Sequence, residues 1–507
     1  MAIVRVPVAG ADPSDAGPVA VIDVGSNSIR LVVFSGLERG ASTLFNEKVL
    51  CGLGRGLTSS GRLHPQGVEM ARQNLVRFTR LARAMGARRI DLLATAAVRE
   101  ATDGSAFVAE IEDLCGQPMH VLDGVEEARL SALGVLSGFP AARGVMGDLG
   151  GGSLELVELV DGDAGRSTTL RLGPFALMER FAGDRSAMRA EIDAQLAASG
   201  WVGEGASATN ANTFYPVGGA WRSLARIHMQ QSGYPLHVVH GYPMRRGQVN
   251  DLSQVISRLG RRSLAKIEGI TRSRLETLPA AALVLSRVLR VLGCRKVVFS
   301  AHGLREGHLF DLLGPAERAH DPLLAVAAGI AKRAARFDMM GDDLVAWTNC
   351  LFVGESAAER RLRLAACLLS DVAWREHPDY RAGQALMQIL HYPMSVGHDE
   401  RVFLAVTVHT RYGGAAGGPE VAPYLGLLDP DEAHRARILG LAQRLAFRVS
   451  GATGTVLKRS ALEYDSAAGK LRLILPSDGS APGGEAVQRR FSALAEALEV
   501  RQAVVDG

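Results

Sequence analysis

Apolar and polar residues follow a mixed strand-and-helix pattern along the first third of the chain. Two β-branched segments flank a Gly-Ser-Asn-Ser turn in residues 19–34, which predicts a β-hairpin. Helical stretches are predicted over about residues 65–85, 106–115 and 126–137, with a strand at 90–94. The chain therefore reads as an α/β protein from residue 19 onward.

The opening pattern recurs after a Gly/Pro/Ala-rich segment at residues 138–144. In residues 144–162 a strand again ends at an acidic residue, a glycine turn follows, and a second strand begins. Asp23 and Asp148 hold the same place in the two copies. An Asp that closes a strand before a glycine turn, found twice at domain spacing, predicts two similar lobes facing each other.

The rest of the chain first completes the second lobe and then becomes mainly helical. Strand–glycine turn–helix units at 215–229 and 296–310 fit the far half of that lobe. Long helices rich in Ala, Leu and Arg start near Pro315, and a late β-hairpin around Asp465–Gly469 precedes a last helix at about 484–500. We predict a loose tail (1–18), a first lobe (19–137), a second lobe (138–313) and a C-terminal helical domain with the late hairpin (314–507).

Composition is that of an ordinary globular protein of several domains. The 507 residues are 47% hydrophobic and 22% charged, and the net charge of +4 is too small to indicate general nucleic-acid binding. Five separated cysteines match neither a disulfide framework nor a zinc site. The start lacks a signal-peptide pattern, and no apolar run reaches the ~18 residues of a membrane span. We expect a cytoplasmic protein with no nucleic-acid partner and no membrane span.

Local clusters of basic residues indicate more about possible anionic ligands than the net charge does. Solvated helix faces account for any one cluster, although together the clusters also suit a long polyanion. They comprise Arg72, Arg77, Arg80, Arg83, Arg88 and Arg89; Arg258, Arg261, Arg262, Lys266, Arg272 and Arg274; and Arg360, Arg361 and Arg363.

The two glycine turns have the chemistry of phosphate-binding loops. A turn without bulky side chains lets successive backbone N–H groups approach phosphate oxygens. The Asp beside each turn would repel a phosphate unless a hard cation bridges the two. Either turn alone also fits an ordinary hairpin with glycine at positive φ, but the shared Asp favours a site. The candidate phosphate-binding residues are Gly25, Ser26, Asn27 and Ser28, and Gly150, Gly151, Gly152 and Ser153.

These turns resemble the phosphate-1 and phosphate-2 motifs of the actin/Hsp70/sugar-kinase superfamily. More narrowly, an ordered set of motifs resembles the exopolyphosphatase/guanosine pentaphosphatase family, strongly over residues 19–313 and weakly beyond. The set is DVGSNSIRLVV, ATAAVREATDG, VLDGVEEARLSALGV, GDLGGGSLELV, TTLRLGPFALMERF, YPVGGAWRSLARIH and GLREGHL. The resemblance implies two actin-like (ribonuclease H-like) lobes around a cleft, and a hydrolase of phosphoanhydride bonds that uses Mg²⁺ or Mn²⁺.

The resemblance also implies catalytic roles for two residues. Glu127, the second acid of VEEARL, occupies the family's catalytic-base position, where it would orient a water against the terminal phosphorus. The alternative is a solvated acid in a helix's first turn, where Glu is common. Arg99 of AAVRE matches the arginine thought to contact the terminal phosphate, where a guanidinium would offset developing charge. The alternative interpretation of Arg99 is an ordinary surface arginine.

Further residues are implied as metal and substrate ligands. Asp148 and Glu155 match the carboxylates associated with the metal, and Asp23 would join them from the first lobe. This sparse acidic set suits Mg²⁺ better than Zn²⁺. Arg274 fits an arginine that binds the anionic chain. Gly219-Ala220 lacks a hydroxyl that many relatives have, and Ser300-Ala301-His302 replaces the usual acidic approach to GLREG; both departures concern substrate details.

The C-terminal helices resemble a degenerate HD-type domain. Ser370-Asp371 stands where a metal-binding HD domain has His-Asp, so we expect no working metal site there. His398-Asp399 is a literal HD pair, but it follows a Pro-containing loop and is expected to start a helix. We expect this domain to help bind substrate or to form a homodimer.

The expected activity is removal of the terminal phosphate of inorganic polyphosphate, with release of orthophosphate. Hydrolysis of guanosine pentaphosphate to tetraphosphate is the alternative within the family. An actin-like kinase or ATPase would need an adenine pocket and an acceptor site. A non-catalytic polyphosphate- or alarmone-binding regulator would not need a water-orienting acid, and the presence of Glu127, Arg99, Asp148 and Glu155 argues against it.

Overall fold

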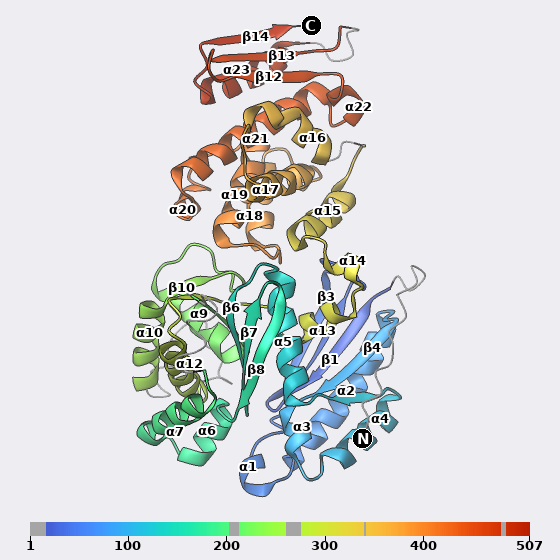
Figure 1. The fold of residues 1–507 in the computed structure, drawn as a ribbon. Helices are drawn as coiled ribbons and strands as arrows, with labels where there is room; N and C mark the ends of the chain where they lie inside the picture. The colour runs from blue at the N-terminus through green and yellow to red at the C-terminus, as the bar shows by residue number, and fades with distance from the viewer. Residues whose placement is uncertain (1–16, 202–211, 260–274, 339–340, 478–482, 507) are drawn as a thin grey trace. The chain divides into compact units, whose positions relative to one another are not determined.

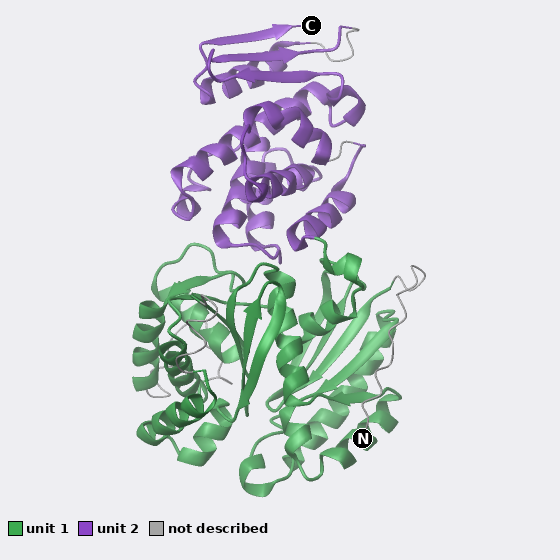
Figure 2. Ribbon diagram, in the orientation of Figure 1, with its two compact units in different colours: residues 1–320 green, residues 321–507 purple. Residues whose placement is uncertain are grey.

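The computed structural model describes residues 17–201, 212–259, 275–338, 341–477 and 483–506. The chain divides into two compact units, Met1–His320 and Asp321–Gly507 (Figure 2). Among the described residues, no helix combines the length and the hydrophobicity that crossing a bilayer requires.

The first unit contains two mixed sheets, each flanked by helices (Figure 1). The first sheet runs in the order β3 (Thr43–Leu50), β2 (Ser28–Phe34), β1 (Val19–Val24), β4 (Arg89–Ala94) and β5 (Met119–Val121). Strand β1 pairs antiparallel with β2 and parallel with β4, and its apolar residues are buried, as expected for a strand covered on both faces. The helices of this lobe are α1 (Leu57–Ser60), α2 (Pro65–Ala84), α3 (Ala96–Glu100), α4 (Gly104–Cys115) and α5 (Gly124–Gly138).

The second sheet repeats this arrangement. Its order is β10 (Pro243–Arg245), β11 (Lys296–Val298), β9 (Thr213–Val217), β6 (Gly144–Leu149), β7 (Leu154–Val160) and β8 (Asp163–Leu170). Strand β6 pairs antiparallel with β7 and parallel with β9, just as β1 pairs with β2 and β4. Its helices are α6 (Pro174–Phe181), α7 (Arg185–Ala198), α9 (Gly219–Gln231), α10 (Arg246–Arg258), α12 (Leu278–Leu292), α13 (Leu304–Leu312) and α14 (Pro315–Arg318).

The predicted α/β architecture of two similar lobes is confirmed, since the sequence repeat corresponds to a repeat of sheet topology. In the two copies Asp23 lies opposite Arg30, and Asp148 lies opposite Glu155.

Helix α13 packs closely against α5, and two glycines make this approach possible. A Cβ at Gly307 would lie 1.8 Å from the Leu130 carbonyl oxygen, and one at Gly134 would lie 2.2 Å from the Gly303 oxygen. Both distances are far shorter than a carbon–oxygen contact allows, so a side chain at either position would push the two helices apart. The start of α13, within GLREG, is thereby held against the helix that carries Glu127.

The second unit is mainly helical. Its central helix α19 (His398–Arg411) is buried on nearly all sides and packs against α18 (Arg381–His391) and α21 (Pro430–Ser450). Ser356 and Glu359 form a reciprocal capping box that starts α17 (Ala357–Leu368). The other elements are α15 (Pro322–Ala334), α16 (Gly341–Thr348), η3 (Asn349–Leu351), η4 (Leu369–Asp371), α20 (Ala422–Leu425), α22 (Gly454–Leu457), β12 (Ala461–Asp465), β13 (Lys470–Ile474), α23 (Glu485–Ala497) and β14 (Gln502–Asp506).

The end of the chain differs from the prediction. The late hairpin is present as β12 and β13, but the last helix stops at Ala497 rather than near residue 500. The chain then returns as β14, which pairs parallel with β13 and completes a three-stranded sheet. Val504 and Val505 favour a strand, and the third strand gives the otherwise marginal hairpin a partner.

Candidate active site

The two glycine turns lie against each other, as predicted. Each closes its hairpin with one hydrogen bond: Gly25 N–H donates to the Ser28 carbonyl (3.1 Å), and Gly150 N–H donates to the Ser153 carbonyl (3.0 Å). A Cβ at Gly151 would lie only 3.3 Å from the Ser26 Cβ. Residues from the two halves of the first unit therefore meet at the turns.

Neighbouring backbone holds both turns in place. The Ser26 carbonyl accepts from Gly54 N–H (2.8 Å), and the Asn27 carbonyl accepts from Gly52 N–H (3.0 Å). The structure thus gives the glycine-rich run at residues 52–56 the role of supporting the first turn. In the second turn, the Gly151 carbonyl accepts from Phe175 N–H (3.0 Å).

The amide groups at the tips of both turns remain available to a ligand. Within the described residues, no acceptor receives the backbone N–H groups of Ser26, Asn27, Gly151 or Gly152. Unused N–H groups that point from successive residues of a glycine turn form an anion-binding concavity. This property of the turns is the one that phosphate binding requires.

Carboxylates from four separate positions surround the turns. Asp23 and Asp148 are the next-to-last residues of β1 and β6, Glu155 lies on β7, and Glu127 lies in the first turn of α5. Burial raises the pKa of each of these groups, and mutual repulsion adds to the effect; Glu155, for example, is repelled by Glu127 and Asp148. The pKa of Glu127 is raised to about 7. Such a cluster of carboxyl groups is stabilised either by protonation or by a compensating cation.

The donor chemistry of these carboxylates fits a hard divalent cation. Ser131 Oγ donates to Asp148 Oδ2 (2.6 Å) and orients that carboxylate, while the buried Glu155 Oε1 has no hydrogen-bond partner within the described residues. Among those residues, however, no three acidic, His or Cys side chains converge closely enough to hold an ion by themselves. Asp23, Asp148 and Glu155 are thus not a closed ligand set. Mg²⁺ commonly retains waters and phosphate oxygens beside one or two carboxylates, so an open set suits it.

Glu127 is largely shielded from solvent and paired, unlike the acid next to it. Its side chain is 12% exposed, whereas Glu126 is exposed to solvent. Arg99 Nη1 donates to Glu127 Oε2 (3.0 Å) and to the Leu122 carbonyl (2.7 Å). Glu127 therefore differs from a fully solvated helix acid, and Arg99, with 22% of its side chain exposed, is partly withdrawn from solvent.

The structure adds positive groups that the sequence reasoning had not assigned. Arg305 is buried, its Nε lies 3.7 Å from Asp23 Oδ2, and its Nε and Nη1 have no hydrogen-bond partner within the described residues. Arg222 donates from Nε to the Ser300 carbonyl (2.9 Å), and burial lowers its pKa to about 10. Arg305 and Arg222 lie inside the quoted motifs GLREGHL and YPVGGAWRSLARIH, and that placement was the available signal.

Glu306 balances part of this charge. Burial would raise its pKa, but attraction to Arg305, His302 and Arg222 outweighs burial and lowers the value. Its Oε2 also accepts from Gly303 N–H (2.9 Å) at the start of α13. Arg274, the remaining predicted ligand, lies outside the described residues.

In the second unit, guanidinium groups surround the carboxylate at the HD-like position. Asp371 accepts from Arg336 Nε (2.6 Å) and Nη2 (3.0 Å), and from Arg411 Nη2 (3.0 Å). His398 begins α19, which confirms the expectation that the literal HD pair starts a helix. The Asp371 oxygens that a metal would need already accept from arginines.

Comparison with known proteins identifies the family. Residues 19–316 match the model described as the Ppx/GppA phosphatase family, and residues 323–505 match the model described as exopolyphosphatase, C-terminal. The chain belongs to the Ppx/GppA phosphatase family. It is 31% identical over 303 residues to a protein named exopolyphosphatase 1 of Mycobacterium leprae, an alignment that covers 57% of this chain and 87% of that protein.

Solved structures of related proteins share the fold of the first unit. An exopolyphosphatase from Cytophaga hutchinsonii superposes with a TM-score of 0.54 at 22% identity, covering 59% of this chain and 99% of that chain. An exopolyphosphatase-like protein superposes with a TM-score of 0.51 at 25% identity, covering 58% and 98%. The actin-like α/β region followed by a helical region is the architecture of this phosphatase family member.

Proposed function

We propose that this phosphatase family member is an exopolyphosphatase, which hydrolyses the terminal phosphoanhydride bond of inorganic polyphosphate. The observation that carries the proposal is the pair of facing glycine turns with unused N–H groups, beside which Glu127 is held by Arg99. The name of the Mycobacterium leprae relative supports polyphosphate as the substrate.

In this proposal the turns bind the end of the chain. Backbone N–H groups of Ser26, Asn27, Gly151 and Gly152 donate to the terminal phosphate oxygens. Arg305 and Arg99 supply positive charge where the equatorial oxygens gain negative charge in the loose transition state.

Glu127 orients the attacking water and accepts its proton. Its raised pKa of about 7 places it near the pH at which a general base works best. Water attacks the terminal phosphorus, the phosphoanhydride bond breaks, and the shortened chain leaves with its bridging oxygen. Asp148, Glu155 and Asp23 would hold Mg²⁺ or Mn²⁺, which would offset phosphate charge when bound.

A phosphate-release assay tests the proposal directly. We expect orthophosphate from long-chain polyphosphate in the presence of Mg²⁺, no release in excess chelator, and much slower release from ATP. Faster turnover of guanosine pentaphosphate than of polyphosphate would assign the enzyme to the alternative substrate. Binding of polyphosphate without release from any of the three substrates would indicate a regulator rather than an enzyme.

A further inference from the structure

Of the three basic clusters in the sequence, the third forms ion pairs throughout and the first forms them in part. In the first cluster, Arg72 pairs with Glu69 and Glu110, and Arg77 pairs with Glu47. In the third, the arginines pair with Glu355, Asp321 and Glu400. The second cluster begins at Arg258, which contributes to a different kind of surface.

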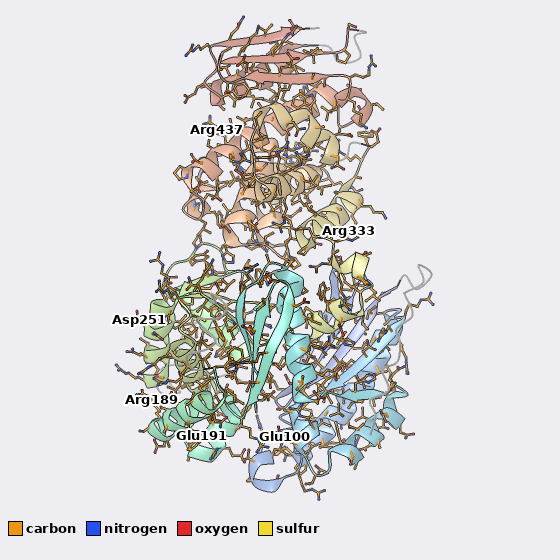
Figure 3. All side chains as sticks on the ribbon, in the orientation of Figure 1. Glu100, Arg189, Glu191, Asp251, Arg333 and Arg437 are labelled. Carbon is orange, nitrogen blue, oxygen red and sulfur yellow. The ribbon has the colours of Figure 1, made fainter. Side chains whose placement is uncertain are left out.

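Arg258 lines one of two adjacent hollows on the helical side of the second lobe, which we name the basic track. One hollow, of about 540 Å³, lies among α7, α10 and α12, and its basic residues are Arg189, Arg246, Arg258, Arg287 and Arg290. The other, of about 600 Å³, lies at the ends of β10 and β11, and its basic residues are Arg245, Arg246, Arg295 and Lys296. Arg246 lines both hollows, so the two adjoin at this residue (α7, α10 and α12 are labelled in Figure 1, and Arg189 in Figure 3).

The positive charge of the basic track is largely uncompensated. Its described lining contains no Asp or Glu. Arg287 pairs with Asp193 (2.6 and 2.7 Å), but within the described residues no ion pair engages the other basic side chains of the track. Asp251 lies on the same helix as Arg246, yet it lines neither hollow.

Like charges are also placed directly opposite one another. Arg245 and Lys296 are cross-strand partners on β10 and β11, and Arg246 N–H donates to the Arg295 carbonyl (2.9 Å). Like charges in such positions destabilise a sheet. On α12, Arg287 and Arg290 are three residues apart and share one helix face. A bound anion would relieve this repulsion.

The lining of the hollow among α7, α10 and α12 also contains a polar group without a hydrogen-bond partner in the part of the chain that the structure describes. Ser253 is 2% exposed, and its Oγ has no hydrogen-bond partner within the described residues. Burial of an unpaired hydroxyl costs stability. An oxyanion seated in the hollow could accept from this hydroxyl.

We propose that the basic track is a second binding site, which holds a linear inorganic polyphosphate chain away from the catalytic turns. Two adjoining hollows that share an arginine suit an extended anion better than a single phosphate. Proteins that hold single-stranded nucleic acid interleave basic groups with aromatic side chains for base stacking, and the described lining contains no aromatic residue. The identity of the polyanion rests on the proposed function, whereas the existence of the site does not.

The test is polyphosphate binding by the double variant Arg246→Ala/Arg290→Ala, measured by calorimetry at several salt concentrations without Mg²⁺. Both arginines are exposed, so folding should survive. Each lost charge should weaken binding about fivefold, the usual scale for a basic residue facing a polyanionic surface. The salt dependence of the binding constant should also fall by a little over one unit of slope for the pair.

Matched variants distinguish an effect of the basic track from an effect of the protein's net charge. Arg80→Ala/Arg88→Ala removes two exposed arginines of the first cluster, for which no ion pair exists within the described residues, and should bind polyphosphate nearly as the wild type does. Arg246→Lys/Arg290→Lys keeps both charges and should recover most of the binding. Hydrolysis of tripolyphosphate should be unchanged in all three variants, because the catalytic turns are untouched.

Each result has a distinct meaning. Wild-type binding by the alanine double variant, or equal losses in both alanine pairs, would overturn the proposal. Equal binding of oligothymidylate and polyphosphate to the track would overturn its assignment to polyphosphate. A further result is loss of polyphosphate binding by the alanine double variant in a protein whose wild type does not hydrolyse polyphosphate. That pair of results would support the binding site and refute the proposed activity.

Discussion

Replacing Glu127 with Gln tests the catalytic role that we propose for this carboxylate. The amide keeps the shape of the side chain, and its oxygen can still accept from Arg99 Nη1, which lies 3.0 Å from Glu127 Oε2. What disappears is the negative charge and the ability to take a proton. Glu126→Gln is the matched control, because Glu126 is the adjacent acid but is exposed.

Turnover should fall by about 10² to 10⁴, the usual contribution of a positioned general base. This corresponds to about 3 to 5 kcal/mol on the activation barrier. Polyphosphate binding should persist or strengthen, because a negative charge near a polyanion is removed. The control should lose less than twofold in turnover.

The same substitution should stabilise the metal-free protein at high pH. Burial raises the pKa of Glu127 from an ordinary 4.5 to about 7, so the folded state holds this proton more tightly than the unfolded state does. The contribution to stability is complete below pH 4.5 and is lost as the pH rises through about 7. At pH 8 the loss is about 3 kcal/mol, and Glu127→Gln should avoid it. At pH 5 the two proteins should differ little.

Two assays on the same purified proteins give the answer: phosphate release against polyphosphate concentration, and chemical denaturation in chelator at pH 5 and pH 8. Wild-type turnover by folded Glu127→Gln would refute the base assignment. A variant that is no more stable than the wild type at pH 8 would refute the argument from burial. Equal effects of both glutamine substitutions would show that general charge, rather than position, is responsible.

The remaining predictions concern other charged groups and the metal content of the protein. Asp148→Ala and Glu155→Ala should each weaken activation by Mg²⁺, measured as the metal concentration for half-maximal turnover; full activity of either variant in excess chelator would exclude a metal role. Arg305→Gln should lower kcat/KM about 10²-fold, because a preorganised positive group beside the turns is lost; an unchanged value would make Arg305 purely structural. In the second unit, Asp371→Asn should cost about 3 kcal/mol in a denaturation titration, because Arg411 and Arg336 lose their charged partner. Elemental analysis should find no stoichiometric Mn, Fe or Zn, and a stoichiometric amount would contradict our interpretation of that region.

The local elements of this protein were predictable from its sequence. The hairpin around Gly25 and its repeat around Gly151 follow from β-branched runs that end in glycine turns. Helix α2 was expected at 65–85 and spans Pro65–Ala84. These features depend on neighbours within a few residues, so the sequence carries them directly. The order of motifs likewise led to the family.

Tertiary structure decided which of the candidate residues are shielded and which partners they have. Glu126 and Glu127 are adjacent and identical in type, and only the packing of α5 exposes one and buries the other against Arg99. Arg305 carries no local signal that separates it from other arginines, and it becomes notable only when α13 brings it to Asp23.

The basic track and the last strand also depend on contacts between segments that are distant in the sequence. Arg189, Arg246 and Arg290 lie far apart in the chain, and only the packing of three helices places them around one hollow. Strand β14 formed where β13 offered an unpaired edge. The burial of a side chain, its ion pairs and the net charge around it all depend on segments that are distant in the sequence and that only the fold brings together. The sequence alone therefore predicted the two glycine turns, and the fold determined which charged groups lie around them.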